Sequence, residues 1–349
     1  MKHNLKITIF LALIFFLSQL IGLIIISQYI DIEKSSSEGK TIVKQKAYNF
    51  TGVKPPELEP EEEKYMWIFI SVAILLGTVI VLVIIRFKKH NIWKFWFLLS
   101  ITVCLFFAFA QFINNLLTFF NIDGSLILFN LTILGFPLTL SGIATILLVI
   151  ALAYYKIYKK SIIIHNFTEL FVYGGLAALI VPAIAVEAAI ILLIIISLYD
   201  MIAVWKTKHM VVMAKFQTQN KLFAGLLMPY DKKTGNLNLS KIKEIKSKNN
   251  IVNNQIKSKK IINNYDNNNN NNNNTKTAIL GGGDIAFPLI FAGTVMKTTG
   301  SFLNPIIIAF TTTIALFLLL TYGKKNKFYP AMPFISAGCF LGYAIVLII

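Results

Sequence analysis

Two aspartates lie inside apolar stretches of the chain, each near one end of its stretch. Asp200 follows Tyr199 and closes the apolar run 181–205. Asp284 follows three glycines and opens the run 278–296. A carboxylate in hydrocarbon costs roughly 2.5–3.5 kcal/mol on insertion scales, so such a residue is by default a functional-site hypothesis. Two carboxyl groups in contact cannot both ionise, and a pair that shares one proton can activate water for hydrolysis. Asp200 and Asp284 are therefore the candidate catalytic residues.

The composition is that of a polytopic membrane protein. Of the 349 residues, 56% are hydrophobic and 14% are charged, which leaves too little polar surface for an ordinary soluble domain. The net charge of +17 comes from lysines that concentrate between the apolar runs, so nucleic acid is not expected as a partner. The two cysteines, Cys104 and Cys339, lie inside apolar segments, which excludes a disulfide framework and a thiolate metal site.

Nine apolar runs are long enough to cross about 30 Å of hydrocarbon. The sequence therefore predicts an all-α polytopic membrane protein with nine transmembrane helices. The expected helices are 7–27, 66–85, 93–114, 132–155, 162–180, 183–204, 278–297, 304–322 and 330–348. Residues 115–131 contain apolar stretches too short to span, and we expect an outer loop or a re-entrant segment there.

Basic residues mark every second connection. They are dense in 206–276, and the fourth connection carries Lys156, Lys159 and Lys160. By the positive-inside rule, the N-terminus and the loop between the sixth and seventh helices face the cytoplasm, and the C-terminus lies outside.

This pattern divides the chain into three parts. Residues 1–205 hold six transmembrane helices with an outer loop at 28–64, and residues 278–349 hold the last three helices. Between them, residues 206–277 are predicted to form a cytoplasmic, largely disordered loop, because a Lys/Asn-rich composition cannot bury a core. Its first part, Met210 to Met228, is expected to form an amphipathic helix on the inner leaflet.

The two aspartates are predicted to lie at the same depth in the membrane. Asp200 precedes Lys206 by six residues, which corresponds to about 9 Å of helix rise. Asp284 follows Lys276 by eight residues, or about 12 Å by the same measure. Both lie near the cytoplasmic end of their helices, so the two side chains could meet.

Two further motifs could shape a site around this pair. Gly281, Gly282 and Gly283 permit non-helical backbone and close approach of a second chain, so a free edge beside Asp284 could pair with an extended substrate. The segment Pro330-Ala331-Met332-Pro333 opens the ninth run at the cytoplasmic side. Its prolines fix an irregular helix start with free carbonyls, which could complete the wall of the site.

Together these residues resemble the intramembrane aspartyl proteases of the presenilin and signal-peptide-peptidase type. The signatures of that family are Tyr-Asp on helix six, Gly-x-Gly-Asp on helix seven and Pro-Ala-Leu on helix nine. Tyr199-Asp200 and Gly281–Asp284 match them in order and membrane side. Pro330–Met332 departs only by methionine in place of leucine, a swap that conserves volume and apolarity.

The resemblance implies an intramembrane-cleaving aspartic endopeptidase with Asp200 and Asp284 as its catalytic residues. It also implies that Tyr199 and the three glycines shape the site, and that Pro330, Ala331 and Met332 position the active-site backbone. The basic loop between helices six and seven matches the presenilin orientation, which favours transmembrane substrates, or remnant signal peptides, with an outer N-terminus. The short loops and Lys/Asn/Ile-rich composition are typical of an archaeal member, for which accessory subunits are not expected. Neither a cofactor nor a metal is implied.

Other functions were weighed against this interpretation. Aspartates at one depth could form a cation or proton relay in a transporter or channel, although no second half of the chain repeats the first. A prepilin-type aspartyl peptidase would share Gly-x-Gly-Asp but lack the helix-nine motif. A zinc protease would require His-Glu-x-x-His, which is missing from the stretch His165 to Glu169. Glu169 and Glu187 also lie in apolar runs, and we expect them to be interfacial or helix-pairing residues.

Overall fold

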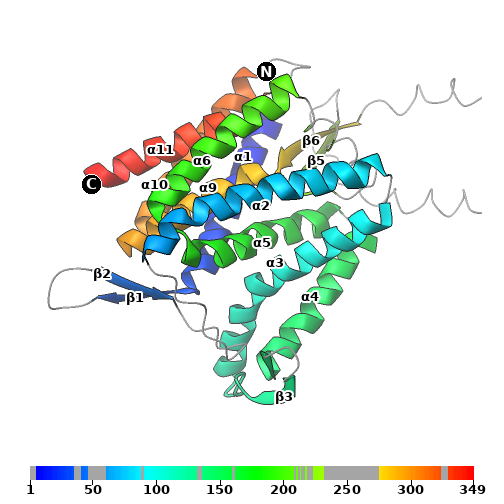
Figure 1. Ribbon diagram of the computed structural model, residues 1–349, viewed down its shortest axis with the longest axis vertical. Helices are drawn as coiled ribbons and strands as arrows, with labels where there is room; N and C mark the ends of the chain where they lie inside the picture. Colours follow the sequence, from blue (N-terminus) through cyan, green and yellow to red (C-terminus); the bar gives the residue numbers. More distant parts are fainter. Residues whose placement is uncertain are drawn as a thin grey trace, which may run out of the picture.

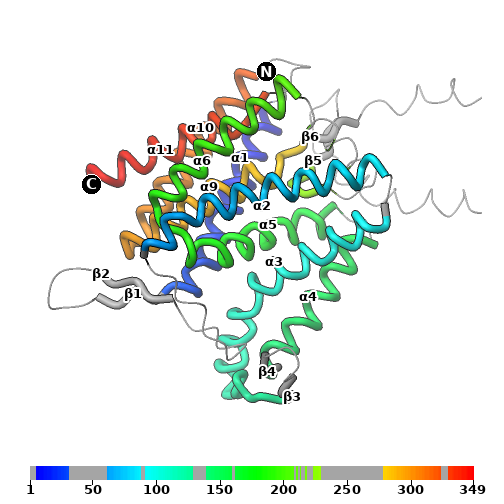
Figure 2. The backbone as a smooth tube through the Cα atoms, viewed as in Figure 1, coloured from blue at the N-terminus to red at the C-terminus, as the bar shows by residue number. Residues whose placement is uncertain are grey.

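The computed structural model describes most of the predicted helices and part of the connections (Figure 2). The described residues are 5–34, 41–45, 60–87, 90–131, 136–158, 162–207, 210, 213, 217, 223–231, 275–323 and 329–349. The Lys/Asn-rich segment 232–274, for which the sequence predicts disorder, lies outside them.

Nine α-helices are present among the described residues, as the sequence predicted. They are α1 (Leu5–Ser27), α2 (Pro60–Arg86), α3 (His90–Phe119), α4 (Leu140–Tyr158), α5 (Ile162–Ile180), α6 (Val186–Met201), α9 (Gly282–Thr299), α10 (Leu303–Tyr322) and α11 (Met332–Ile348). Seven of them, α1 to α6 and α10, are long and apolar enough to cross a membrane by length and composition. The all-α membrane fold is therefore confirmed.

Within the described parts of the chain, three antiparallel strand pairs lie between the helices. They are formed by β1 (Ile30–Lys34) with β2 (Thr41–Gln45), β3 (Ile127–Leu131) with β4 (Phe136–Thr139), and β5 (Gly225–Asp231) with β6 (Thr275–Gly281). The second hairpin corrects the predicted helix 132–155, which begins only at Leu140. Pro137 lies before Leu140, in the part of the predicted helix that is not helical. A proline there would remove a hydrogen bond from the interior of the helix.

The third hairpin corrects two other boundaries. Residues 278–281 were assigned to the seventh transmembrane helix, but they form the end of β6, and α9 begins at Gly282. Gly281 has φ −66° and ψ 144°, so the backbone is still extended at the position that caps α9. The predicted amphipathic helix from Met210 to Met228 is wrong at its end, because Gly225–Met228 belong to β5. The apolar residues there serve a strand that pairs with the segment before Asp284.

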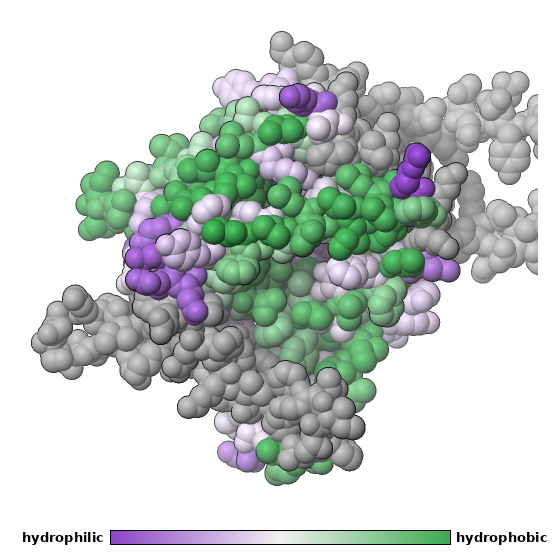
Figure 3. Space-filling model, in the orientation of Figure 1, coloured by the Kyte–Doolittle hydropathy of each residue, from purple (hydrophilic) through white to green (hydrophobic). Residues whose placement is uncertain are grey.

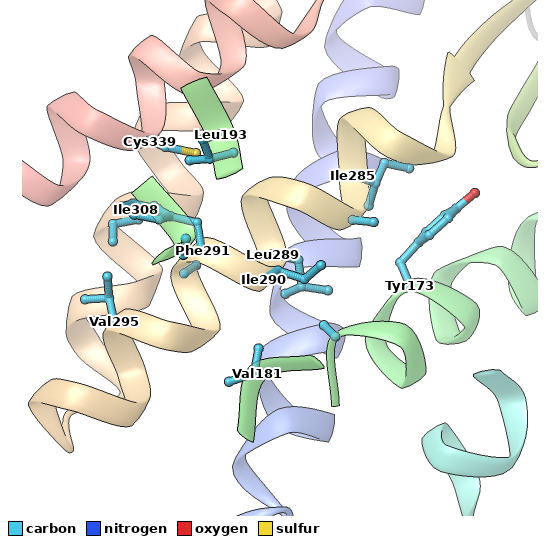
Figure 4. Close-up of a cluster of buried hydrophobic side chains, with 14 of the residues drawn as sticks. Tyr173, Val181, Leu193, Ile285, Leu289, Ile290, Phe291, Val295, Ile308 and Cys339 are labelled. Carbon is cyan, nitrogen blue, oxygen red and sulfur yellow. The ribbon is translucent and has the colours of Figure 1, made fainter. Parts of the chain in front are cut away.

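Helix α9 lies at the centre of the molecule. It packs against α1, α5, α6, α10 and α11, and most of its side chains are buried (Figure 1). Figure 4 shows how its side chains Ile285, Leu289 and Phe291 meet residues of the surrounding helices. The helix that carries Asp284 is therefore held on several sides by close packing, the main source of helix association inside a membrane.

Helix α2 is packed differently. It lies against α6 and α3, and only 6% of its most apolar 18-residue stretch is buried within the molecule. Figure 3 shows a hydrophobic surface over this helix, with hydrophilic residues gathered at its two ends. A long apolar surface of this kind on a helix that ends in polar residues is what a lipid-facing transmembrane helix requires.

Helices α3 and α5 approach one another closely at a glycine. A Cβ placed on Gly175 of α5 would lie 1.8 Å from the carbonyl oxygen of Cys104 on α3. No side chain fits in that space, so Gly175 lets the two backbones pack in contact. Helix α5 is thereby fixed against α3, with its other faces turned toward α1 and α9.

Candidate active site

Asp200 lies at the end of α6 and is bound by the start of α11. Its side chain is 5% exposed, and its Oδ2 accepts the backbone N–H of Met332 at 3.1 Å. Ala331, the residue before Met332, also has its backbone N–H near this carboxylate. The first N–H groups of a helix have no partner within the helix, and they carry the positive end of its dipole. Ala331 caps α11 without a side chain that could accept these bonds, so the carboxylate of Asp200 acts in its place.

The contact between α6 and α11 extends one turn further along α6. Ser197 Oγ lies 2.8 Å from Ser336 Oγ, in hydrogen-bonding distance. Directly after Asp200 and Met201, the chain passes into a π-helical turn, Ile202–Lys206. Turns of this type are rare and are frequently found at functional sites. Met332, in the segment predicted to form a wall of the site, donates its N–H to Asp200, and the role of Pro330–Met332 in the site stays a prediction.

Asp284 lies in the first turn of α9, three residues after the capping Gly281. The backbone N–H of Gly281 interacts with its carboxylate. Asp284 has the position of the acidic residue of a capping box, three residues after the cap residue. A Cβ on Gly281 would lie 3.1 Å from Asp284 Oδ2, so glycine leaves the carboxylate room to take this position. Asp284 itself is partly buried.

The two aspartates lie on neighbouring helices, Asp200 near the end of α6 and Asp284 in the first turn of α9. Helices α6 and α9 are in contact, and Asp200 lies close enough for its charge to act on Asp284. Each carboxyl group is held by the N-terminus of a different helix, α11 for Asp200 and α9 for Asp284. Two carboxyl groups that lie close together can share one proton, because they do not both ionise readily.

The three glycines before Asp284 have different surroundings. A Cβ on Gly282 would lie 2.6 Å from the hydroxyl oxygen of Tyr173 on α5. Gly283 is exposed, and a Cβ there would meet only the ring of Phe287, at 3.5 Å. Within the folded protein, Gly282 is therefore the glycine that close packing requires, while Gly283 leaves open space beside Asp284.

We expect Gly282→Ala to destabilise the protein by about 1–3 kcal/mol, because the added methyl group overpacks a buried site. Gly283→Ala is the matched control, and we expect its free energy of unfolding to stay within about 0.5 kcal/mol of wild type. Both can be measured by denaturant titration in mixed micelles. Equal stabilities of the two variants would contradict the assigned packing of Gly282.

Tyr199 points toward α2. Its hydroxyl oxygen lies 3.1 Å from Oγ1 of Thr78, which joins α6 to the lipid-facing helix. Consecutive residues of a helix point in directions about 100° apart, so Tyr199 and Asp200 face different neighbours. The structure thus brings the Asp284 and Met332 segments to Asp200 and places the hydroxyl of Tyr199 at the contact with α2.

A buried cluster of polar side chains behind Asp284 was missed by the sequence analysis. Lys156 of α4 donates a hydrogen bond to one carboxylate oxygen of Glu169, and the hydroxyl of Tyr173 donates to the other. Lys156 is 6% exposed and Glu169 1%. Tyr173 also lies close enough to Asp284 for that charge to act on it. The predicted helix-pairing role of Glu169 agrees with this contact, but Lys156 is a core residue and does not belong to the cytoplasmic loop.

A signal for this cluster was present in the sequence. His165, Glu169 and Tyr173 are spaced four residues apart in an apolar run, so they share one face of a helix. Figure 4 shows Tyr173 projecting from α5 with its hydroxyl directed toward the side where α9 begins. The partner Lys156, on the preceding helix, could not be assigned from spacing.

Comparisons with known proteins match nearly the whole chain. A family model described as "Signal-peptide peptidase, presenilin aspartyl protease" matches residues 45–349. Two similar solved structures are described as a presenilin family intramembrane aspartate protease, in the C222 and P2 space groups. The first has a TM-score of 0.54 at 13% identity and covers 97% of each chain. The second has a TM-score of 0.52 at 14% identity and covers 96% of this chain and 94% of that chain. A comparison with curated proteins finds no match.

Proposed function

Because the chain belongs to the signal-peptide peptidase and presenilin aspartyl protease family, and is an intramembrane aspartyl protease, we propose that Asp200 and Asp284 cleave peptide bonds within transmembrane segments. The observation that carries this proposal is the proximity of the two carboxyl groups, each held at the N-terminus of a helix. One carboxylate removes a proton from a water molecule while that water attacks the peptide carbonyl. The other, protonated, donates to the carbonyl oxygen and then to the leaving amine.

Substrate would bind as an extended strand along the free edge of β6. Both backbone groups of Leu227 in β5 bond to the side chain of Asn166, so they point away from β6. Ile279 of β6 lies directly opposite Leu227. In an antiparallel pair, when the backbone groups of one residue point away from the partner strand, those of the opposite residue also point away. The N–H and C=O of Ile279 therefore face away from β5, on an edge that leads to Asp284. An unwound substrate could satisfy its own backbone groups there.

The orientation in the membrane is also part of this proposal. The basic segment 206–276 favours a cytoplasmic loop between α6 and α9 and an outer C-terminus. Lys156 does not support this orientation, because that residue is buried. Lys159 and Lys160 lie three and four residues later in the sequence and still favour it. The active site then lies toward the cytoplasmic side. We propose that this single chain acts on transmembrane proteins with an outer N-terminus, without accessory subunits.

The proposal can be tested with the purified chain in liposomes that contain a single-span reporter protein. We expect cleavage with a bell-shaped pH profile, because activity requires one proton shared between the two aspartates and is lost when that proton is removed or a second is added. Ion flux measured in the same liposomes tests the transporter alternative. Flux that is abolished by Asp284→Asn, with no cleavage of any reporter, would overturn the proposal.

A further inference from the structure

The face of α5 that turns toward β5 carries a row of polar side chains outside the catalytic pair. His165 and Asn166 contact β5, while Glu169 and Tyr173 continue the row toward Gly282 of α9. Polar groups inside a membrane are costly, so a continuous row on one helix indicates a function. None of these residues contacts Asp200 or Asp284 by a hydrogen bond among the described interactions, and the mechanism above does not use them.

Asn166 takes the place of a third strand beside β5. Its side-chain Nδ2 donates to the carbonyl oxygen of Leu227 at 2.8 Å, and its Oδ1 accepts the N–H of Leu227 at 3.0 Å. These two bonds reproduce those that a neighbouring strand would make. At Leu227, the outer edge of β5 is therefore paired with a side chain of a transmembrane helix.

His165 fixes the beginning of the same strand. Its Nε2 lies 2.8 Å from the carbonyl oxygen of Gly225. Gly225 has φ +152°, and a Cβ there would lie 2.3 Å from the carbonyl oxygen of Leu280. Only glycine fits this conformation and this approach to β6. The strand thus begins at a residue whose carbonyl oxygen contacts α5 and whose backbone lies directly against β6.

Backbone contacts connect β5 to the turn that carries Asp284. Gly225 pairs with Gly281, the cap residue whose N–H interacts with the Asp284 carboxylate. The N–H of Gly282 donates to the carbonyl oxygen of Ala224 at 3.2 Å. A displacement of β5 would therefore move the turn that sets the carboxylate of Asp284.

We propose that Asn166, assisted by His165, is a positioning residue for the catalytic Asp284, acting through β5 and β6. This inference rests on the proposed function, in which Asp284 is one of the two reacting carboxyl groups. A role confined to fold stability would lower the amount of folded protein. A positioning role lowers turnover in the protein that has folded, because small misplacements of a catalytic group strongly reduce rate.

The test compares Asn166→Leu with Asn115→Leu, the same substitution at an exposed site on α3. On folded protein isolated by size exclusion, we expect Asn166→Leu to lower kcat about 10- to 100-fold with KM changed less than about threefold. Asn166→Asp keeps the acceptor for the Leu227 N–H but loses the donor, and we expect an intermediate kcat. A kcat for Asn166→Leu within twofold of the Asn115→Leu value would overturn the inference.

A second measurement does not depend on catalysis. Hydrogen exchange of peptides from 223–231 and 275–284 should be faster in Asn166→Leu than in wild type or Asn115→Leu, since the outer bonds of β5 are lost. Unchanged exchange would contradict the positioning role even if no reporter were cleaved. Absence of cleavage by wild type, with the expected change in exchange, would instead refute the proposed function and leave the structural link in place.

Discussion

Replacing Asp200 or Asp284 with asparagine is expected to abolish cleavage, with a fall in kcat of about 10⁴-fold or more, as when one member of a catalytic unit is removed. Asparagine keeps the shape of the side chain but can neither accept a proton from water nor donate one as an acid. The loss should be similar for each variant and no larger for the double variant, because the two carboxyl groups work as a pair. Single-turnover cleavage of a reporter by equal amounts of folded protein measures this.

The matched control is Glu187→Gln, which removes an exposed carboxylate from the first turn of α6, the helix that carries Asp200 near its end. We expect its kcat to equal that of wild type. Cleavage retained in either aspartate variant, at more than a trace of the wild-type rate, would refute the assignment of the pair. A loss in the control as well would show that α6 tolerates no change of charge.

Lys156→Met is expected to destabilise the protein by about 3–5 kcal/mol, since breaking a buried ion pair leaves the other charge without compensation. Glu169 is 1% exposed, and after the substitution the hydroxyl of Tyr173 would remain bonded to its carboxylate, with His165 Nε2 4.0 Å from the other oxygen. Methionine fills a similar volume and packs well, so the effect reports the lost charge and not a cavity. Unfolding by denaturant in mixed micelles gives the free energy.

The double variant Lys156→Met with Glu169→Gln provides the control for this effect. It removes both charges, so we expect it to recover a large part of the stability that the single variant loses. Lys94→Met, an exposed lysine on α3, should change stability by less than about 0.5 kcal/mol. A double variant as unstable as Lys156→Met would mean that the pair is not what stabilises this part of the core.

The sequence was sufficient to predict the number of helices and their approximate positions, although the starts of α4 and α9 were predicted too early. Asp200 and Asp284 are recognisable because a carboxylate is costly in an apolar run. The depth predicted for Asp284 from helix rise does not apply, because Thr275–Gly281 form a strand and α9 begins only at Gly282. For Ala331 and Met332, the sequence predicted only their position at an irregular helix start. Prolines predicted an irregular helix start, but not that its N–H groups would cap a carboxylate of another helix.

The β5–β6 hairpin could not be predicted for a physical reason. Its two strands are separated by a long low-complexity segment, so no turn signal connects Gly225–Asp231 with Thr275–Gly281. The apolar residues of β5 also fit a helix of the same composition, and periodicity does not separate the two for short runs. What decides the strand is tertiary: the side chain of Asn166 offers a partner to each backbone group of Leu227.

Lys156 shows a similar limit. By its position near the end of an apolar run it counts as a loop cation, and the positive-inside rule uses it in that sense. Its burial depends on Glu169, thirteen residues later on the neighbouring helix. Charge pairing between helices is not visible in the spacing of either helix alone, so the lysine was placed in the wrong environment.

The most direct test of the account is to locate the bond that the wild-type protein breaks in a single-span reporter, by mass spectrometry of both products. The account predicts a cut inside the apolar span, in its cytoplasmic half, since Asp200 and Asp284 lie in the cytoplasmic part of their helices by the proposed orientation. Two products whose masses sum to the reporter plus one water would establish hydrolysis at that depth. Cuts confined to the polar flanks of the span would contradict the account.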